Sequence, residues 1–244
     1  MSAYQNRWTL ESILLLLFVI VFIGSGIGPL DRFTWFLEVA PAMIGVAILV
    51  ATHRRFRFTP LAYSLSFVFA CILCVGGHYT YAQVPIGNWV RDWLHLSRNH
   101  YDRFGHLAQG VVPAILAREL LIRTSPLGLV GRTDTAPTRA SGEAATPVCP
   151  PNSGGTHYGG KWLFFLVTCV CLAISATYEL IEWQVAVWTG TAADAFLGTQ
   201  GDVWDTQEDM ATALVGAILA QLLLARVHDR QIDDVRKAGT FGSG

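Results

Sequence analysis

The sequence has few charged residues for its length. Asp, Glu, Lys and Arg make up 14% of its 244 residues, whereas 52% of the residues are hydrophobic. Soluble globular domains carry about 25% charged residues, and the mean hydropathy of this chain is +0.40. The composition therefore favours an integral membrane protein over an ordinary soluble domain. The formal net charge of -1 gives no bulk basic character, so we expect no nucleic-acid partner.

The sequence also lacks the short motifs of common catalytic sites. It contains no G-x-S-x-G nucleophile elbow, no H-E-x-x-H zinc motif, no P-loop and no G-x-G-x-x-G dinucleotide motif. No internal repeat supports an inverted-repeat transporter. Cys71, Cys74, Cys169 and Cys171 lie in apolar runs, where cysteine acts as a small hydrophobic residue. Any chemistry must therefore be sought among the polar residues close to the apolar segments.

Six runs of mainly apolar residues are long enough to cross a membrane. Each has about 17 to 22 residues, and roughly 20 are needed to cross the hydrocarbon core as a helix. Lipid offers the backbone no hydrogen-bond partners, so each run must be helical. The sequence therefore predicts an all-α polytopic membrane protein, a bundle of six transmembrane helices. The predicted spans are Leu10–Ile27, Trp35–Thr52, Leu61–Gly77, Phe104–Ile122, Trp162–Trp183 and Met210–Val227.

The spans divide the chain into four regions. Residues 1–123 contain the first four helices and a polar connection at the outer face, and residues 161–227 contain the last two helices. Residues 124–160 are rich in Gly, Pro, Ser and Thr, which is typical of a flexible loop. We expect this loop and the tail of residues 228–244 on the cytoplasmic side.

Arginine and lysine predict that both termini are cytoplasmic, because positive charge marks that side of a membrane protein. The second and fourth connections and the C-terminal tail are basic, whereas the fifth connection has several acids and neither arginine nor lysine. The third connection weakens the contrast, since it contains Arg91, Arg98 and Arg103. Six crossings nevertheless return the chain to the side on which it started.

Polar residues gather in stripes near the outer ends of three predicted helices. A charged side chain within a span costs about 2.5 to 3.5 kcal/mol on insertion scales, so such residues usually serve a function or pair with one another. Each stripe repeats a helical spacing such as i, i+4, i+7 and therefore lies on one helix face. The stripes are Asp102, His106 and Gln109, then Ser175, Glu179 and Glu182, then Asp202, Asp205 and Asp209.

The predicted topology sends these polar stripes to one membrane face, where Glu38 can join them. Our candidate catalytic residues are Asp102, His106, Glu179, Glu182, Asp205 and Asp209. The candidate metal ligands are His106, Glu179, Glu182, Asp205 and Asp209. The candidate substrate-binding residues are Arg98, Arg103, His78 and Tyr79.

Carboxylates together with histidine are suitable ligands for Zn²⁺, Mn²⁺ or Fe²⁺, and carboxylates alone suit Mg²⁺ or Ca²⁺. A divalent metal ion would also offset the mutual repulsion of the acids. Two other interpretations stay open. The residues form a polar site for a headgroup or a transported solute, or the acids pair with Arg91, Arg98 and Arg103 in a purely structural network.

The same segments resemble the YjdF-type family of bacterial inner-membrane proteins. The matching pieces are "HYTYAQVPIGNW", "RNHYDRFGHLAQG", "ATYELIEW" and "QGDVWDTQEDM". This resemblance implies a multi-pass fold in the bacterial inner (cytoplasmic) membrane, and it supplies no established reaction.

A weaker likeness is to VanZ-like membrane proteins, which are linked to glycopeptide-antibiotic resistance. "DRFGH" fits the first part of their pattern, but Glu182 stands where that family has Gln. Asp102, His106, Glu179 and Asp205 are the positions that look alike.

Three functional hypotheses follow. The first is an outward-facing membrane enzyme, metal-dependent in one version, that acts on a lipid or cell-envelope intermediate with a carboxylate or His106 as general base. Arg98 or Arg103 would then bind a phosphate group. The second is a proton- or cation-coupled transporter, and the third is a noncatalytic assembly or immunity factor. The lipid bilayer is the expected surrounding in each case, and the sequence leaves the oligomeric state open.

Overall fold

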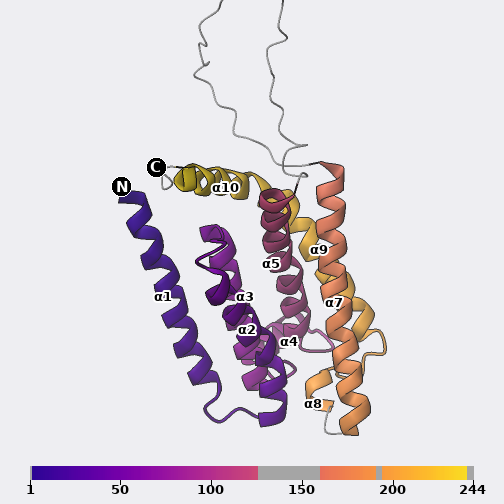
Figure 1. Ribbon diagram of the computed structural model, residues 1–244. Helices are drawn as coiled ribbons and strands as arrows, with labels where there is room; N and C mark the ends of the chain where they lie inside the picture. The colour runs from indigo at the N-terminus through magenta and orange to yellow at the C-terminus, as the bar shows by residue number, and fades with distance from the viewer. Residues whose placement is uncertain (1, 126–159, 191–193, 241–244) are drawn as a thin grey trace, which may run out of the picture.

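The fold is a bundle of helices, shown in Figure 1 as a computed structural model that describes residues 2–125, 160–190 and 194–240. The described part contains helices and no strand, which confirms the all-α fold. Most of the predicted loop at 124–160 lies outside the described residues. The helices are α1 (Ser2–Ser25), α2 (Arg32–Thr52), α3 (Pro60–Tyr79), α4 (Pro85–Leu94), α5 (Tyr101–Thr124), α7 (Lys161–Thr189), α8 (Asp194–Leu197), α9 (Asp205–Leu223) and α10 (Ala225–Thr240).

Three described helices, α2, α3 and α7, are long and apolar enough to cross a membrane. A fourth span results if α9 and residues Ala225–Ala238 of α10 count together, although they meet at an angle of 64°. Length and composition therefore do not confirm the predicted number of six. The apolar part of α1, Leu10–Ser25, is shorter than the others, and α5 carries Arg118 and Glu119 within its length.

Local capping explains where two of the spans begin. The carboxylate of Asp31 accepts a hydrogen bond from the backbone N–H of Thr34 at 2.7 Å and so caps α2. This bond holds the pKa of Asp31 below its ordinary value. Thr59 caps α3, and Pro60 occupies the first turn, where its missing N–H costs nothing.

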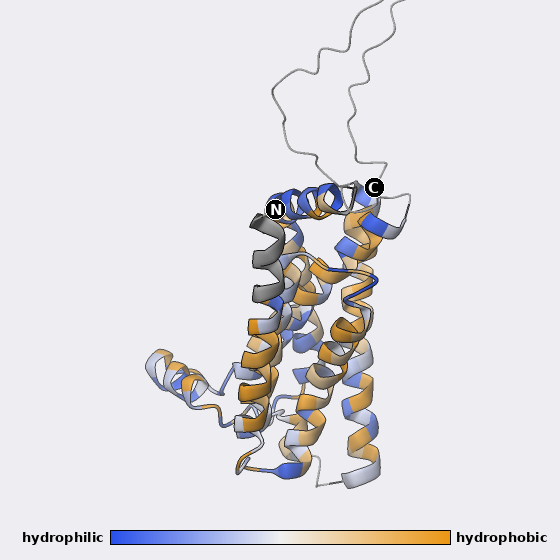
Figure 2. Ribbon diagram, turned by 60° about the vertical axis from the view of Figure 1, so that its left-hand side comes forward, coloured by the Kyte–Doolittle hydropathy of each residue, from blue (hydrophilic) through white to orange (hydrophobic). Residues whose placement is uncertain are grey.

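Charge divides the bundle into two ends. α1 begins and α10 ends at the same end of the bundle, close to the C-terminal end of α5 (Figure 1). We call it the basic end, because Arg57, Arg118, Arg123 and Arg236 lie there. The opposite end, with Asp102, Glu179, Asp205 and Asp209, is the acidic end. Figure 2 shows hydrophobic residues along the length of the bundle between these ends.

A buried polar network fixes α10 across the basic end. Nδ1 of His228 lies 3.2 Å from Nη1 of Arg118, and because arginine can only donate, Nδ1 must accept. The ring proton is therefore on Nε2, which donates to Oε2 of Glu119 at 3.1 Å. Glu119 also accepts from the hydroxyl of Thr59 at 2.8 Å and from Nη1 of Arg123 at 2.6 Å.

The connection between α3 and α5 contains a helix, α4, that the sequence analysis did not predict. Its apolar residues Ile86, Trp89 and Trp93 are spaced i, i+3, i+7 and share one face. They are 58%, 72% and 79% exposed. Figure 2 shows α4 projecting from the side of the bundle. The spacing is present in the sequence, but the segment is too short to cross a membrane and so does not stand out among the apolar runs.

Candidate metal and substrate site

His106 lies at the centre of a group of carboxylates from three helices. Its Nε2 is 3.6 Å from Oδ1 of Asp102, one turn earlier on α5. The same atom is 3.7 Å from Oε1 of Glu179 on α7 and 3.7 Å from Oδ1 of Asp209 on α9. Side chains from all three predicted polar stripes therefore meet at His106. We call Asp102, His106, Glu179 and Asp209 the His106 cluster.

Close helix packing positions the His106 cluster. A Cβ added to Gly110 would lie 1.9 Å from the carbonyl oxygen of Ala213, so α5 and α9 touch through their backbones there. Gly110 is one turn after His106 on α5, and Ala213 is one turn after Asp209 on α9. Small residues allow such an approach between membrane helices. The contact fixes the separation of the His106 and Asp209 side chains.

The geometry of the His106 cluster fits a small divalent ion. One ligand atom from each of Asp102, His106 and Asp209 can be chosen so that all lie within 4.8 Å of one another. In a tetrahedral site with bonds of about 2.1 Å, the ligand atoms are about 3.4 Å apart, and the 3.6 and 3.7 Å separations around His106 approach that value. Oε1 of Glu179 is buried and accepts no hydrogen bond from the described part of the chain. It is therefore available as a further ligand.

Two arginines lie beside the cluster and bind its acidic neighbours. Nη1 of Arg98 is 2.6 Å from Oδ1 of Asp205 and 3.2 Å from Oδ2 of Asp202. Nη2 of Arg103 is 2.9 Å from Oδ1 of Asp205, and its Nη1 contacts Asp209. The sequence predicts that Arg98 or Arg103 binds a phosphate group, and both guanidinium groups are directed at carboxylates of the chain itself.

Asp202 lies in the segment before α9, outside the helices. Its Oδ1 accepts the backbone N–H of Trp204 at 2.9 Å, and its Oδ2 is 3.3 Å from Nη2 of Arg103. The hydrogen bond from Trp204, with Arg98 and Arg103 nearby, holds the pKa of Asp202 below its ordinary value. The carboxylate therefore stays ionised and links this segment to α5.

Asn99 holds the segment that carries Arg98. Its side chain is fully buried and donates to the carbonyl of Val84 at 3.1 Å. Its Oδ1 accepts from the N–H of Tyr101 at 3.0 Å, at the start of α5. Its backbone exchanges hydrogen bonds with the side chain of Gln200 at 3.0 and 2.9 Å. Arg98 is thereby placed between α5 and the segment before α9.

A cavity of about 760 Å³ opens beside His106 and is bounded by α2, α3, α5 and α7. Most of its lining is apolar, and one end is polar. The polar end consists of Glu38, Tyr81, Asp102, His106, Tyr178 and Glu182. The cavity gives a ligand access to Asp102 and His106, two members of the cluster.

Tyr81 and Tyr178 line the cavity although neither is a predicted site residue. The hydroxyl of Tyr178 on α7 donates to Oε2 of Glu38 on α2 at 3.1 Å. A signal was present for Tyr178, because it lies four residues before Glu182 and so on the same helix face. Tyr81 gave no such signal. Its place depends on Gly76, where a Cβ would come within 2.3 Å of the tyrosine ring.

The remaining predicted residues divide between the site and other contacts. Glu182 lines the cavity, and Asp205 binds the two arginines. His78 instead contacts α1, since its Nδ1 is 2.8 Å from the carbonyl oxygen of Ser25. Tyr79 packs edge-on against His78, with ring centroids 4.6 Å apart. The structure does not bring His78 and Tyr79 to the His106 cluster.

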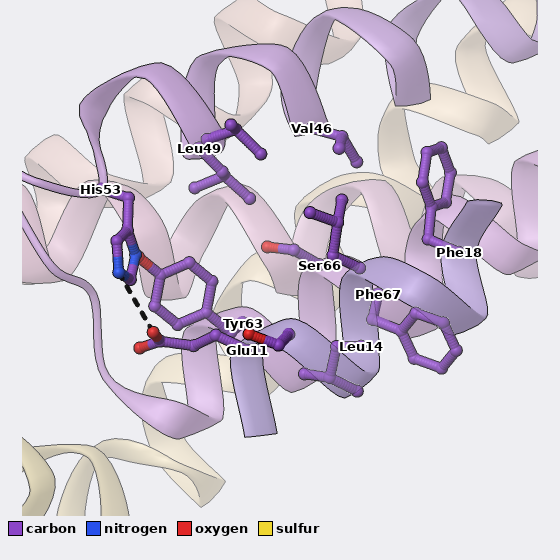
Figure 3. Close-up of a pocket in the computed structure, with 12 residues that line it drawn as sticks. Glu11, Leu14, Phe18, Val46, Leu49, His53, Tyr63, Ser66 and Phe67 are labelled. Atoms are coloured by element: carbon purple, nitrogen blue, oxygen red, sulfur yellow. Dashed lines mark hydrogen bonds and ion pairs between the residues drawn. The ribbon is translucent and has the colours of Figure 1, made fainter. Parts of the chain in front are cut away.

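A second pocket, of about 200 Å³, lies between α1, α2 and α3 towards the basic end. Nε2 of His53 is 3.2 Å from Oε2 of Glu11, as Figure 3 shows, and its Nδ1 is 3.0 Å from the hydroxyl of Tyr63. Leu14 and Phe67 are among the apolar residues that line the rest. These contacts tie the first half of α1 to α2 and α3, away from His106.

Comparisons with known proteins identify the family. Residues 10–230 match the family described as predicted membrane protein (DUF2238). The chain belongs to this family. It is also 48% identical over 213 residues to the inner membrane protein YjdF of Escherichia coli (strain K12), covering 87% of this chain and 88% of that protein. No solved structure matches. The resemblance to the YjdF-type family is therefore confirmed, and the likeness to VanZ-like proteins stays a prediction.

Proposed function

We propose that this membrane protein is a metal-dependent enzyme that acts on a lipid or cell-envelope intermediate. The observation behind the proposal is the group of Asp102, His106 and Asp209, whose ligand atoms lie within 4.8 Å of one another. The group lies beside a cavity of about 760 Å³, which is large enough for a small-molecule substrate. A divalent ion would relieve the repulsion between the buried acids.

The residues take separate roles in this proposal. Asp102, His106, Glu179 and Asp209 bind the ion, which supplies a Lewis acid or an activated water when bound. Glu182 lines the cavity but is not one of the carboxylates close to His106. It is therefore not needed as a metal ligand, and it is our candidate for the general base. Asp205 positions Arg98 and Arg103, whose charges offset those of the cluster.

The proposal includes six crossings of the bacterial inner membrane, with both termini cytoplasmic. α1 and α5 have 24 residues each, and a helix of that length reaches about 36 Å, more than the roughly 30 Å of the hydrocarbon core. α1 begins and α10 ends at the basic end (Figure 1), the side that the rule for positive charges assigns to the cytoplasm. The His106 cluster then faces outward. The E. coli relative is an inner membrane protein, which supports this location.

Metal analysis of the detergent-purified protein tests the proposal. Wild type is expected to contain a near-stoichiometric transition metal by inductively coupled plasma mass spectrometry, and the double variant His106→Ala, Glu179→Ala should lack it. Asp92→Ala is the matched control, because Asp92 is 68% exposed and lies outside the cluster. A wild type that stays metal-free after supplementation with candidate ions would overturn the metal-dependent function.

A proton- or cation-coupled transporter is the second candidate. It is favoured by the carboxyl groups of Glu38, Asp102 and Glu182, which line a single cavity. Proton-coupled flux in proteoliposomes that is lost in Glu182→Gln, from a protein without metal, would favour it over the enzyme.

A noncatalytic assembly or immunity factor is the third candidate. The arginine contacts of Asp205 and Asp209 suit it. Such a protein should keep its cellular function when the acids are all replaced by amides.

A further inference from the structure

We infer that the cavity beside His106 is a groove for the hydrocarbon chain of an outer-leaflet amphiphile, with the polar head of that molecule at Asp102 and His106. The inference deepens the proposed function and rests on it for the chemistry performed on the head. It names the substrate class as a lipid-like molecule that enters from the bilayer.

The groove is open sideways to lipid. α2 packs on α3, α3 on α5 and α5 on α7, so α2 and α7 form the walls and α3 and α5 the floor. The walls contribute Ile44, Ile48, Ile174 and Ile181. These side chains are 60%, 56%, 41% and 51% exposed, respectively. Exposed apolar surface on a membrane span faces hydrocarbon, and a chain can therefore enter between α2 and α7 without crossing water.

The length of the groove matches one leaflet. On α2 its lining runs from Glu38 to Ile48, which is about 15 Å along a helix. On α7 it runs from Glu182 to Val170, which is about 18 Å. Half of the hydrocarbon core is about 15 Å thick. An extended chain that begins at the His106 cluster would therefore end near the middle of the bilayer.

Gln109 provides hydrogen-bond acceptors where the apolar part meets the polar end. Gln109 and Pro113 of α5 both line the groove. Because proline has no N–H, Pro113 leaves the carbonyl of Gln109 without its helical donor. Oε1 of Gln109 is also buried without a partner in the described part of the chain. A head with N–H or O–H donors would satisfy these groups.

The charges at the polar end favour an amine or a hydroxyl head. Glu38, Asp102 and Glu182 line it, whereas the guanidinium groups of Arg98 and Arg103 contact Asp205. Among the described residues, the lining of the groove includes neither arginine. A phosphate head would meet carboxylates and would need a divalent cation between them.

Gly45 offers a way to fill the groove. It lines the cavity, and a Cβ there meets no atom within 4 Å, so Gly45→Trp adds bulk without displacing the polar end. Gly24→Trp is the matched control, because Gly24 on α1 is equally unobstructed and lies outside the groove. Ile48→Trp is a second variant at the deep end, where Ile48 is 56% exposed and the fold should tolerate the change.

Binding is measured by native mass spectrometry of the full chain, titrated with oleylamine, octylamine, monooleoylglycerol and oleoyl phosphate. Wild type and Gly24→Trp should bind one molecule of oleylamine or monooleoylglycerol. Gly45→Trp should bind at least about tenfold more weakly, because the indole would displace part of the hydrocarbon chain from the groove. Losing the burial of only two CH₂ groups already weakens binding by about that factor. Ile48→Trp should bind octylamine like wild type and oleylamine more weakly. After a chelator has removed any bound metal, oleoyl phosphate should bind only when a divalent cation is added back.

The same preparations separate this inference from the proposed function. Equal binding by all four proteins, or no binding of the amines and monooleoylglycerol by wild type, would overturn the groove. Cation-free binding of oleoyl phosphate as tight as that of oleylamine would overturn the assignment of the head. If wild type contains metal and Gly45→Trp binds the amphiphiles as tightly as wild type, only the groove is refuted. Loss of amphiphile binding in Gly45→Trp from a protein that takes up no metal would refute only the metal-dependent function.

Discussion

Gly216 of α9 lies against Gly110 of α5 so closely that a Cβ added to Gly216 would be 3.3 Å from the Cα of Gly110. The same Cβ would be 2.2 Å from the carbonyl oxygen of Leu107. Asp209 is two turns before Gly216, and His106 is one turn before Gly110. The backbone contact of α5 and α9 is therefore the support on which the His106 cluster is built.

Gly216→Ala should separate α5 from α9 and destabilise the protein. Alanine gains about 1 kcal/mol of helix preference over glycine, but the added methyl group meets backbone that cannot rotate away, and overpacking costs about 1 to 3 kcal/mol. A lower thermal unfolding midpoint in detergent checks this. Gly45→Ala is the control and should be neutral or stabilising, because its Cβ meets no atom within 4 Å. Equal midpoints for both variants would contradict the close contact.

Arg103→Gln should be far more damaging than Arg91→Gln. Arg103 is 10% exposed and pairs with Asp205 and Asp209, which are 9% and 3% exposed. Asp205 keeps its pair with Arg98, but Asp209 loses its arginine partner, and removing one partner of a buried pair costs about 3 to 5 kcal/mol. Arg91 pairs with Asp92 at the surface, where a pair is worth about 0 to 1 kcal/mol. Chemical unfolding of both variants in the same detergent measures the difference, and similar losses would show that the Arg103 network is not structural.

The segment before α9 should stay attached to α5 until the pH becomes strongly acidic. The pKa of Asp202 is lowered in the fold by the N–H of Trp204 and by Arg98 and Arg103. Its stabilising contribution is therefore present above the ordinary aspartate pKa of about 3.9 and is lost as the pH falls through the lower folded value. Amide hydrogen exchange of residues 199–204 against pH measures this. Loosening near pH 6 would contradict it, and Asp202→Asn should loosen the segment at every pH.

Glu119→Gln should release α10 from the basic end. Glu119 is fully buried and accepts hydrogen bonds from Thr59, Arg123 and His228. Losing hydrogen bonds to a buried charged group costs about 1.5 to 3 kcal/mol, so α10 amides should exchange at least about tenfold faster with deuterium. Glu208→Gln is the control, because Glu208 is 55% exposed at the acidic end. Unchanged exchange in Glu119→Gln would mean that other contacts hold α10.

Much of the helical framework was predictable from the sequence. Apolar length located α1, α2, α3, α5, α7 and α9, because a backbone in lipid must satisfy its own hydrogen bonds. Helical spacing also placed Asp102 with His106, since neighbours four residues apart share a face whatever the rest of the chain does. α4 was not predictable in this way, because it is too short to cross a membrane. The bend between α9 and α10 was not predictable either, because the apolar run Met210–Val227 continues through it.

The tertiary structure decided which polar atoms meet. The sequence offered Arg98, Arg103 and His78 as partners for a substrate, whereas packing turned the arginines towards Asp205 and His78 towards Ser25. It also opened the groove between α2 and α7 and brought Tyr178 to Glu38. These outcomes depend on how the helices rotate and slide against one another. Contacts between distant residues such as Gly110 and Ala213 set that geometry, and no local pattern of spacing records them.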